Sequence, residues 1–360
     1  MKKTIFICAL SLFIFQAALA QVSDQRQAKI DSLENLLLTA GEDSNKVNIL
    51  CGLCRKYKVE NPERGLEYGK LCLELARQIV FKKGIAGGLH DVAGAYKRQG
   101  KFQEAIGNYK ESIKLKEELG DNKGISWSLN GIGLAYAIQG KYDSAIVYYE
   151  QCLKIKEELK DKKALVFTWM NMGNVYSYKK NYAKALEYHQ KALKTDRELG
   201  DRLGIAADLH NIGSVHQSQK DYDKALGFYM ESLEIRKEMG DRASTAGCLN
   251  NIAIVYSNQG NEAKAIEYYM EGLSLYEELG HKYGIAGTLI NVAHSYGDQG
   301  KHEQAIAYQK KSLEVAKEIG MKRMIKISYQ DLAESYAQLN QYKEAYEYHQ
   351  LYCETKETIR

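Results

Sequence analysis

Residues 250–269 read NNIAIVYSNQGNEAKAIEYY, and this stretch decides the fold because residues 130–149 repeat its pattern as NGIGLAYAIQGKYDSAIVYY. Related segments occur at every 40-residue step between and beyond the two. The period is marked by seven alanines: Ala105, Ala145, Ala185, Ala225, Ala265, Ala305 and Ala345. A fixed period of this kind is typical of a solenoid, in which one helical unit is repeated because it cannot bury its apolar face alone.

Each unit is predicted to contain a helix A, a tight turn and a longer helix B. Apolar residues recur at helical spacing, as in Leu129, Ile132 and Tyr136. The residues at the turn between the helices are Gly100, Gly140, Lys180, Lys220, Gly260, Gly300 and Asn340. Glycine and asparagine suit the left-handed conformation that follows a helix C-terminus. A second periodic turn, LGD at 119–121 and its equivalents, ends helix B with glycine and offers an aspartate that can cap the next helix A.

These residues carry a resemblance to a known family. The set that matches is Leu129, Ile132, Gly133, Tyr136, Ala145 and Tyr149, and it resembles the tetratricopeptide repeat pattern. The 40-residue unit resembles the variety found in Pins-type scaffold proteins. The resemblance implies an all-α solenoid over residues 45–360, built from about eight helix pairs as a right-handed superhelix. Helices A would line its concave face, and residues 21–44 would form an extra N-terminal helix.

The N-terminal 20 residues are a separate segment. Lys2 and Lys3 precede the apolar run TIFICALSLFIF, and Ala18-Leu19-Ala20 follows it. This arrangement predicts a secretory signal peptide over residues 1–20 and an exported protein, periplasmic or secreted. An N-terminal membrane anchor is the alternative, although the apolar run is short for a span.

Composition favours a helical protein that does not bind nucleic acid. The chain has a single proline, and its 50 Lys and Arg side chains nearly balance 46 Asp and Glu. No metalloprotease, P-loop, hydrolase or kinase motif occurs, so we expect neither an enzyme nor a cofactor. The eight histidines have no metal-ligand spacing. Most of the 27 tyrosines are interpreted as packing residues of the repeat.

The cysteines are predicted to pack as small apolar residues, without a disulfide framework. The motif CGLC at 51–54 invites a redox interpretation, but no strand precedes it. The repeat places Cys54 at a small packing position and Cys51 toward the groove. Cys72 and Cys152 fall on the small position of helix B. Glutamates such as Glu238 precede a basic residue such as Arg242 by four positions, which predicts an ion pair across the turn.

Candidate binding residues are the helix A positions that vary between repeats. By the resemblance, those facing the groove include His90, Asn130, Asn174, His210, Asn250 and His294. Asparagine can donate and accept at once, which suits the backbone of an extended peptide. A second row, Asn171, Asn211, Asn251 and Asn291, is interpreted as tying one repeat to the next. The Lys/Arg clamp that some such repeats use for C-terminal carboxylates is missing, so we do not expect a partner of that type.

The sequence therefore predicts an exported scaffold, without catalysis, that binds another protein or an extended peptide. The alternative is the periplasmic sensor half of a membrane-bound bacterial signalling protein, such as a histidine kinase, a cyclase or a DNA-binding regulator. That alternative requires Arg360 to be a truncation and places the membrane span in a missing C-terminal segment. A redox protein acting through CGLC is the third hypothesis.

Overall fold

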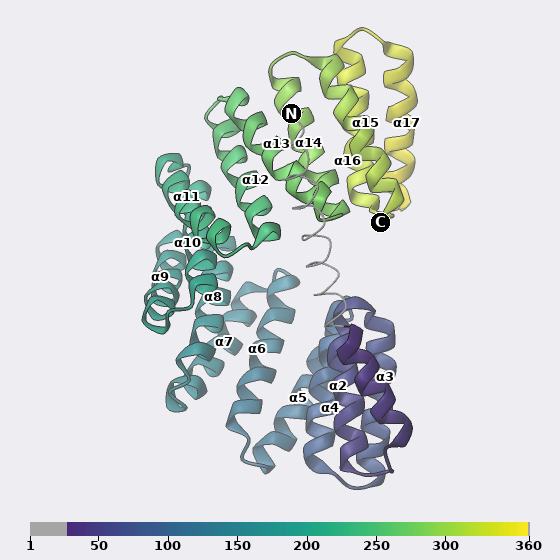
Figure 1. The fold of residues 1–360 in the computed structure, drawn as a ribbon, viewed down its shortest axis with the longest axis vertical. Helices are drawn as coiled ribbons and strands as arrows, with labels where there is room; N and C mark the ends of the chain where they lie inside the picture. Colours follow the sequence, from purple (N-terminus) through teal and green to yellow (C-terminus); the bar gives the residue numbers. More distant parts are fainter. Residues whose placement is uncertain (1–26, 359–360) are drawn as a thin grey trace, which may run out of the picture. The chain divides into compact units, whose positions relative to one another are not determined.

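The computed structural model describes residues 27–358, and every regular element within them is an α-helix (Figure 1). The predicted signal peptide lies outside the described residues. A helix over residues 27–39 comes first. It is followed by α2 (Ser44–Glu60), α3 (Pro62–Gln78), α4 (Lys82–Arg98), α5 (Phe102–Glu118), α6 (Asn122–Ile138), α7 (Tyr142–Glu158), α8 (Lys162–Tyr178), α9 (Tyr182–Leu199), α10 (Arg202–Ser218), α11 (Tyr222–Glu238), α12 (Arg242–Asn258), α13 (Glu262–Glu278), α14 (Lys282–Asp298), α15 (His302–Glu318), α16 (Lys322–Gln338) and α17 (Tyr342–Thr358). None of the helices between residues 27 and 358 has both the length and the apolar character that a membrane span requires.

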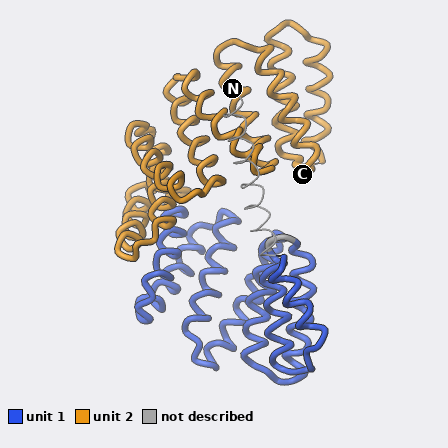
Figure 2. Tube along the Cα trace, viewed as in Figure 1, with its two compact units in different colours: residues 1–175 blue, residues 176–360 orange. Residues whose placement is uncertain are grey.

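The chain divides into two compact units, coloured separately in Figure 2. Unit 1 ends at Val175 and contains α2 to α7 with most of α8, and unit 2 begins at Tyr176 and contains α9 to α17. Within unit 1, α2 packs on α3, α4 on α5 and α6 on α7. Within unit 2, α10 packs on α11, and the same pairing continues to α16 and α17 (Figure 1). Each unit is thus a stack of antiparallel helix pairs, as the 40-residue period predicts.

The turns with glycine or asparagine have the left-handed conformation that these residues predict, and the repeat imposes the same conformation on two lysines. The residue after helix A has a positive φ in seven turns: Gly100, Gly140, Lys180, Lys220, Gly260, Gly300 and Asn340. At the second turn, Asp121 Oδ1 accepts a hydrogen bond of 2.8 Å from the backbone N–H of Gly124 at the start of α6. Asp161 and Asp201 cap α8 and α10 in the same way, at 3.0 and 3.1 Å. The predicted capping role of these aspartates is confirmed.

The tyrosines and periodic alanines form the packing between paired helices. Six of the alanines are fully buried: Ala105, Ala145, Ala185, Ala225, Ala265 and Ala305. The tyrosine near the end of helix A stacks on an aromatic ring twelve residues later, as in Tyr136 on Tyr148 with ring centroids 5.5 Å apart. In the first pair, Tyr57 stacks on Tyr68 at the same 5.5 Å. Tyr57 and Tyr68 are one residue closer in the sequence than the other stacked pairs, because the first turn is one residue shorter.

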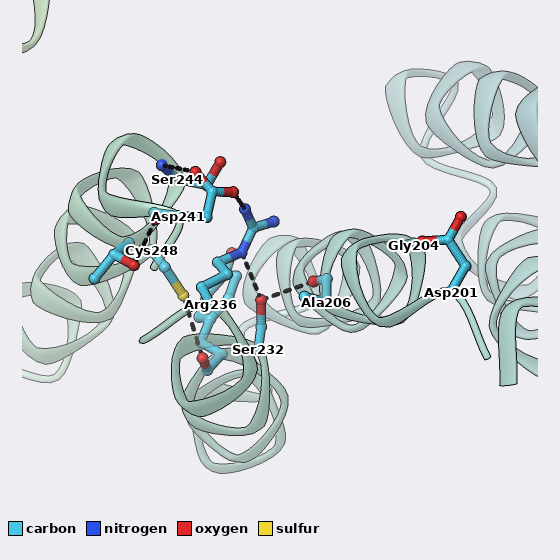
Figure 3. Close-up of polar contacts among 10 residues, drawn as sticks. Asp201, Gly204, Ala206, Ser232, Arg236, Asp241, Ser244 and Cys248 are labelled. Atoms are coloured by element: carbon cyan, nitrogen blue, oxygen red, sulfur yellow. Dashed lines mark hydrogen bonds and ion pairs between the residues drawn. The ribbon is translucent and has the colours of Figure 1, made fainter. Parts of the chain in front are cut away.

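Polar side chains join helices both within a pair and between neighbouring pairs, as Figure 3 shows for α10 to α12. Ser232 Oγ donates a hydrogen bond of 2.7 Å to the carbonyl of Ala206. Arg236 Nε donates to Ser232 Oγ at 3.1 Å, and its Nη1 donates to Asp241 Oδ2 at 3.4 Å. Asp241 in turn caps α12 by accepting from the N–H of Ser244 at 3.3 Å. One arginine therefore connects the end of α11 to the start of α12.

The predicted ion pairs across the turn are wrong in their partners. Glu238 contacts Arg202, which precedes it by 36 residues, and Lys82 Nζ lies 3.0 Å from Glu118 Oε2 at the same separation. The reason is that helix B runs antiparallel to helix A of its own pair. Its last turn therefore lies beside the first turn of that helix A. These pairs are exposed, so each contributes at most about 1 kcal/mol.

The prediction for Cys51 and Cys72 is also wrong, because the two form a disulfide with Cα atoms 5.7 Å apart. Cys51 is buried between α2 and α3 and does not face the groove. Cys54 is fully buried, in agreement with its predicted packing role, and burial raises its pKa to about 12. Cys51 is bonded to Cys72 and not to Cys54, and a buried thiol with a raised pKa is a poor nucleophile, so both observations argue against CGLC as a redox pair.

The close packing of α6 on α7 gives a first testable prediction. A Cβ atom at Gly133 would lie 2.6 Å from the Tyr149 ring, whereas one at Gly107 on α5 would meet nothing within 4 Å. Both glycines are helical, and alanine in a helix is favoured over glycine by about 0.5–1 kcal/mol. We therefore expect Gly107→Ala to raise the melting temperature and Gly133→Ala to lower it. Thermal unfolding followed by circular dichroism measures both, and equal shifts of the same sign would contradict the packing.

Candidate functional site

A groove of about 630 Å³ in unit 1 is the main candidate for a binding site. It is lined mainly by the A helices α2, α4, α6 and α8, with side chains including Lys58, His90, Lys97, Trp127, Asn130 and Phe167. We call this site the unit 1 groove. Its position agrees with the expectation that the A helices carry the binding surface, and its volume falls in the range of small-ligand and peptide-segment sites.

Two aromatic side chains in the unit 1 groove depart from the repeat. Trp127 on α6 is 52% exposed and Phe167 on α8 is 60% exposed. The same position holds a small residue in four other repeats: Gly87, Ala207, Gly247 and Gly287. More than half of each side chain is exposed to water, and large exposed aromatic side chains are frequent anchors of binding surfaces.

Hydrogen bonds fix the polar side chains of the groove. His90 Nδ1 lies 3.0 Å from Ser128 Oγ, and that hydroxyl accepts a hydrogen bond of 3.0 Å from Lys116 Nζ. Asn171 Nδ2 donates to Asn130 Oδ1 at 3.2 Å. Burial and the nearby Lys116 cation hold the pKa of His90 well below its usual value, so this imidazole is neutral at pH 7.

Positive charge gathers at the end of the groove formed by α2 and α4. The buried carboxylate of Asp91 contacts Arg55 Nε at 3.2 Å and Lys58 Nζ at 3.6 Å. Lys97 lies beside them, and burial together with the cations Lys58 and Arg98 lowers its pKa to about 8. Among the described residues, Lys97 and Arg98 make no ion pair or side-chain hydrogen bond. This corner therefore holds more positive than negative charge.

The six residues predicted for the groove do not form one site. His90 and Asn130 line the unit 1 groove, whereas Asn174 is exposed and does not line it. In unit 2, His294 Nε2 lies 2.8 Å from Asp331 Oδ2 in a second, acidic pocket of about 370 Å³. The prediction thus identified two of the residues that line the unit 1 groove.

The remaining two predicted residues are used within the solenoid. His210 Nε2 lies 2.9 Å from Asn251 Nδ2, and Asn250 Nδ2 donates to Thr288 Oγ1 at 2.7 Å. Both contacts join one A helix of unit 2 to the next. For Asn171 and Asn251, the interpretation that the second asparagine row ties repeats together is confirmed.

Sequence reasoning missed Trp127, Phe167 and Lys97 as site residues. Each stands where most other repeats have a small or uncharged residue; the equivalents of Lys97 include Ala137, Ser177 and Ser257. That departure from the repeat was the available signal.

Comparison with known proteins agrees with the repeat architecture. The family model for the tetratricopeptide repeat matches residues 84–158, 165–238, 209–278 and 284–358. No curated protein matches the sequence.

Solved structures similar to this chain include the apo form of the quorum sensor NprR from B. thuringiensis, with a TM-score of 0.64 and 16% identity over 96% of this chain and 97% of that one. A Rap protein complexed with Competence and Sporulation Factor has a TM-score of 0.57 and 18% identity over 97% of each chain. A STAND protein with a tetratricopeptide repeat sensor from Pyrococcus horikoshii has a TM-score of 0.62 and 18% identity, and the match covers 86% of this chain and 53% of that one. At these identities the likeness concerns the fold alone.

Proposed function

Because this chain belongs to the tetratricopeptide repeat family, a family of repeated helix pairs, we propose that it is an exported scaffold that binds a peptide segment of another protein in the unit 1 groove. The observation that carries the proposal is the exposed pair Trp127 and Phe167 inside a groove of about 630 Å³. The role is binding without catalysis. This binding role is the same whether the chain is a free scaffold or the sensory part of a larger signalling protein. In the second case the groove would be the input site.

Two observations support export. The first 20 residues have the charged, apolar and small-residue order of a signal peptide. The described part of the chain contains the Cys51–Cys72 disulfide, and disulfides persist mainly in oxidising compartments. Expression of the full chain in a bacterium, followed by fractionation and by mass measurement of the N-terminus, tests this part of the proposal. Recovery in the cytoplasm with residues 1–20 still attached would contradict it.

The binding role is tested by selecting peptides from a random displayed library against the chain without residues 1–20. We expect the double variant Trp127→Ala/Phe167→Ala to bind the selected peptides at least about tenfold more weakly, because buried aromatic anchors carry about 2 kcal/mol or more. Both side chains are more than half exposed, so their removal should leave the melting temperature nearly unchanged.

The matched control is Tyr283→Ala, which removes an aromatic side chain that is 57% exposed on α14 of unit 2. This variant should bind the selected peptides as the unmodified protein does. Failure to enrich any peptide, or equal binding by the Trp127→Ala/Phe167→Ala variant, would refute the groove as the binding site.

A further inference from the structure

Resting on the proposed function, we infer that the unit 1 groove selects an acidic segment, one in which Asp or Glu side chains flank a large aromatic or aliphatic side chain. The groove has two features, and each needs a different chemical group in the ligand. Its cations require carboxylates, and its exposed rings require an apolar surface. A segment that carries both satisfies the whole lining at once.

The charged side chains that line the groove are mostly positive. Six cationic side chains line the groove: Lys58, Lys97, Arg98, Lys123, Lys156 and Lys163. Only one carboxylate does so, that of Asp161, which lies 3.7 Å from Lys123 Nζ. The whole chain, in contrast, carries a net charge of only +4. The excess of positive charge in the groove is therefore local, and an anionic ligand would be attracted to it.

Lys97 is the cation that gains most from such a ligand. It is half-buried on α4, and Asp91 is already shared between Arg55 and Lys58. The lowered pKa of Lys97 agrees with this crowding, since neither a carboxylate nor water fully compensates its charge. A ligand carboxylate beside Lys97 would supply the missing counter-charge. Solvent screens charges less strongly at this half-buried position, so the contact between the carboxylate and Lys97 should strengthen binding.

The cations of the lining come from all four A helices, which indicates a ligand with more than one carboxylate. Lys58 and Lys97 come from α2 and α4, whereas Lys123 and Lys163 come from α6 and α8, the helices that carry Trp127 and Phe167. Lys123 Nζ also lies 5.7 Å from the Trp127 ring centre. A single terminal carboxylate cannot reach cations from four helices. Internal Asp and Glu side chains of an extended segment can, because successive residues advance by about 3.3 Å.

A nucleic acid would also meet cations and aromatic rings, but the groove fits it less well. Single-strand binding sites track a continuous row of phosphates. Here, Asp91 and Asp161 lie among the cations, and a continuous phosphate backbone would have to pass both. A peptide can place a carboxylate beside Lys97 and neutral residues beside Asp91 and Asp161. The acidic pocket of unit 2, lined by His294, Asp298, Asp331 and Glu334, has the opposite charge and should not take the same ligand.

The test uses peptides selected from a random library displayed with a blocked C-terminus, so that only side-chain carboxylates are available. We expect enrichment of sequences with Asp or Glu around an aromatic or large aliphatic residue. The affinity of a selected peptide should fall about tenfold in Lys97→Gln and be largely restored in Lys97→Arg. The control Lys154→Gln removes the same charge from an exposed position on α7 and should have no effect.

The outcomes separate the two proposals. Selection of neutral apolar peptides whose binding is insensitive to salt and to Lys97→Gln would overturn the acidic ligand while leaving peptide binding intact. Dependence on a free C-terminus, or displacement of the peptide by an equimolar single-stranded oligonucleotide, would also overturn it. If no selected peptide distinguishes the protein from Trp127→Ala/Phe167→Ala, the proposed function itself fails.

Discussion

Replacing Asp208 with threonine should stabilise the protein, and the gain should grow as the pH rises from about 4 to about 8. Asp208 on α10 is completely buried, and its charged neighbour is Asp196 on α9, which is 3% exposed. Burial and the adjacent Asp196 raise the pKa of Asp208 to about 8. Other repeats hold a neutral residue here: Ser128, Thr168, Cys248, Thr288 and Ser328.

The sign follows from proton binding. Between the ordinary aspartate pKa of 3.8 and the folded-state value of about 8, the folded protein holds one proton that the unfolded chain has released. The contribution of Asp208 to the free energy of unfolding therefore falls as the pH rises, by up to about 1.4 kcal/mol per pH unit. Asp208→Thr removes that loss, so the gain should be small near pH 4 and should grow to at most about 5 kcal/mol at pH 8.

The quantity to measure is the difference between variant and unmodified protein in urea unfolding at pH 5 and pH 8. The difference is needed because burial lowers the pKa values of His189 and His210 to about 4. These imidazoles make the protein more stable as the pH rises from about 4 toward 6.5. The control Glu234→Gln removes an exposed carboxylate from α11 and should shift neither curve. A gain from Asp208→Thr that is the same at both pH values would contradict the raised pKa.

Removing the Cys51–Cys72 disulfide should destabilise the N-terminal helix pair of unit 1. The bond closes a sequence separation of 21 residues between α2 and α3. Chain-entropy arguments assign about 3 kcal/mol to a loop of that size, because the cross-link restricts the unfolded chain. Cys51→Ser/Cys72→Ser should therefore lower the unfolding midpoint. Reductant should lower the midpoint of the unmodified protein to the same value and leave the variant unchanged.

A thiol count provides a second measurement of the same bond. Cys54, Cys152, Cys248 and Cys353 are free, so four cysteines of the chain without residues 1–20 should be alkylated in denaturant before reduction and six after it. The control is Cys353→Ser, which changes an exposed free thiol and should not affect the midpoint. Alkylation of all six cysteines without reductant would show that the bond does not form in the expressed protein.

Part of the candidate site could be predicted from the sequence. The repeat identified the A helices as the source of binding residues, and His90 and Asn130 do line the unit 1 groove. Asn250 occupies the same repeat position, but its side chain donates a hydrogen bond of 2.7 Å to Thr288 Oγ1 of the next A helix. The position within the repeat specifies where on the helix a side chain is attached. The side chains of the neighbouring repeat determine whether it is left available for a ligand.

The sequence by itself determined the helix pairs, their turns and their caps, because each depends on residues within one 40-residue unit. The left-handed Gly100 and the capping Asp121 act on the backbone a few residues away. Only the tertiary structure decided which distant side chains meet. The antiparallel packing of α2 on α3 brings Cys51 to Cys72, and the stacking of successive A helices places Trp127 and Phe167 in the same groove as Lys97. Such contacts depend on side-chain volume and direction across 20 to 70 residues of chain, which a repeat period does not encode.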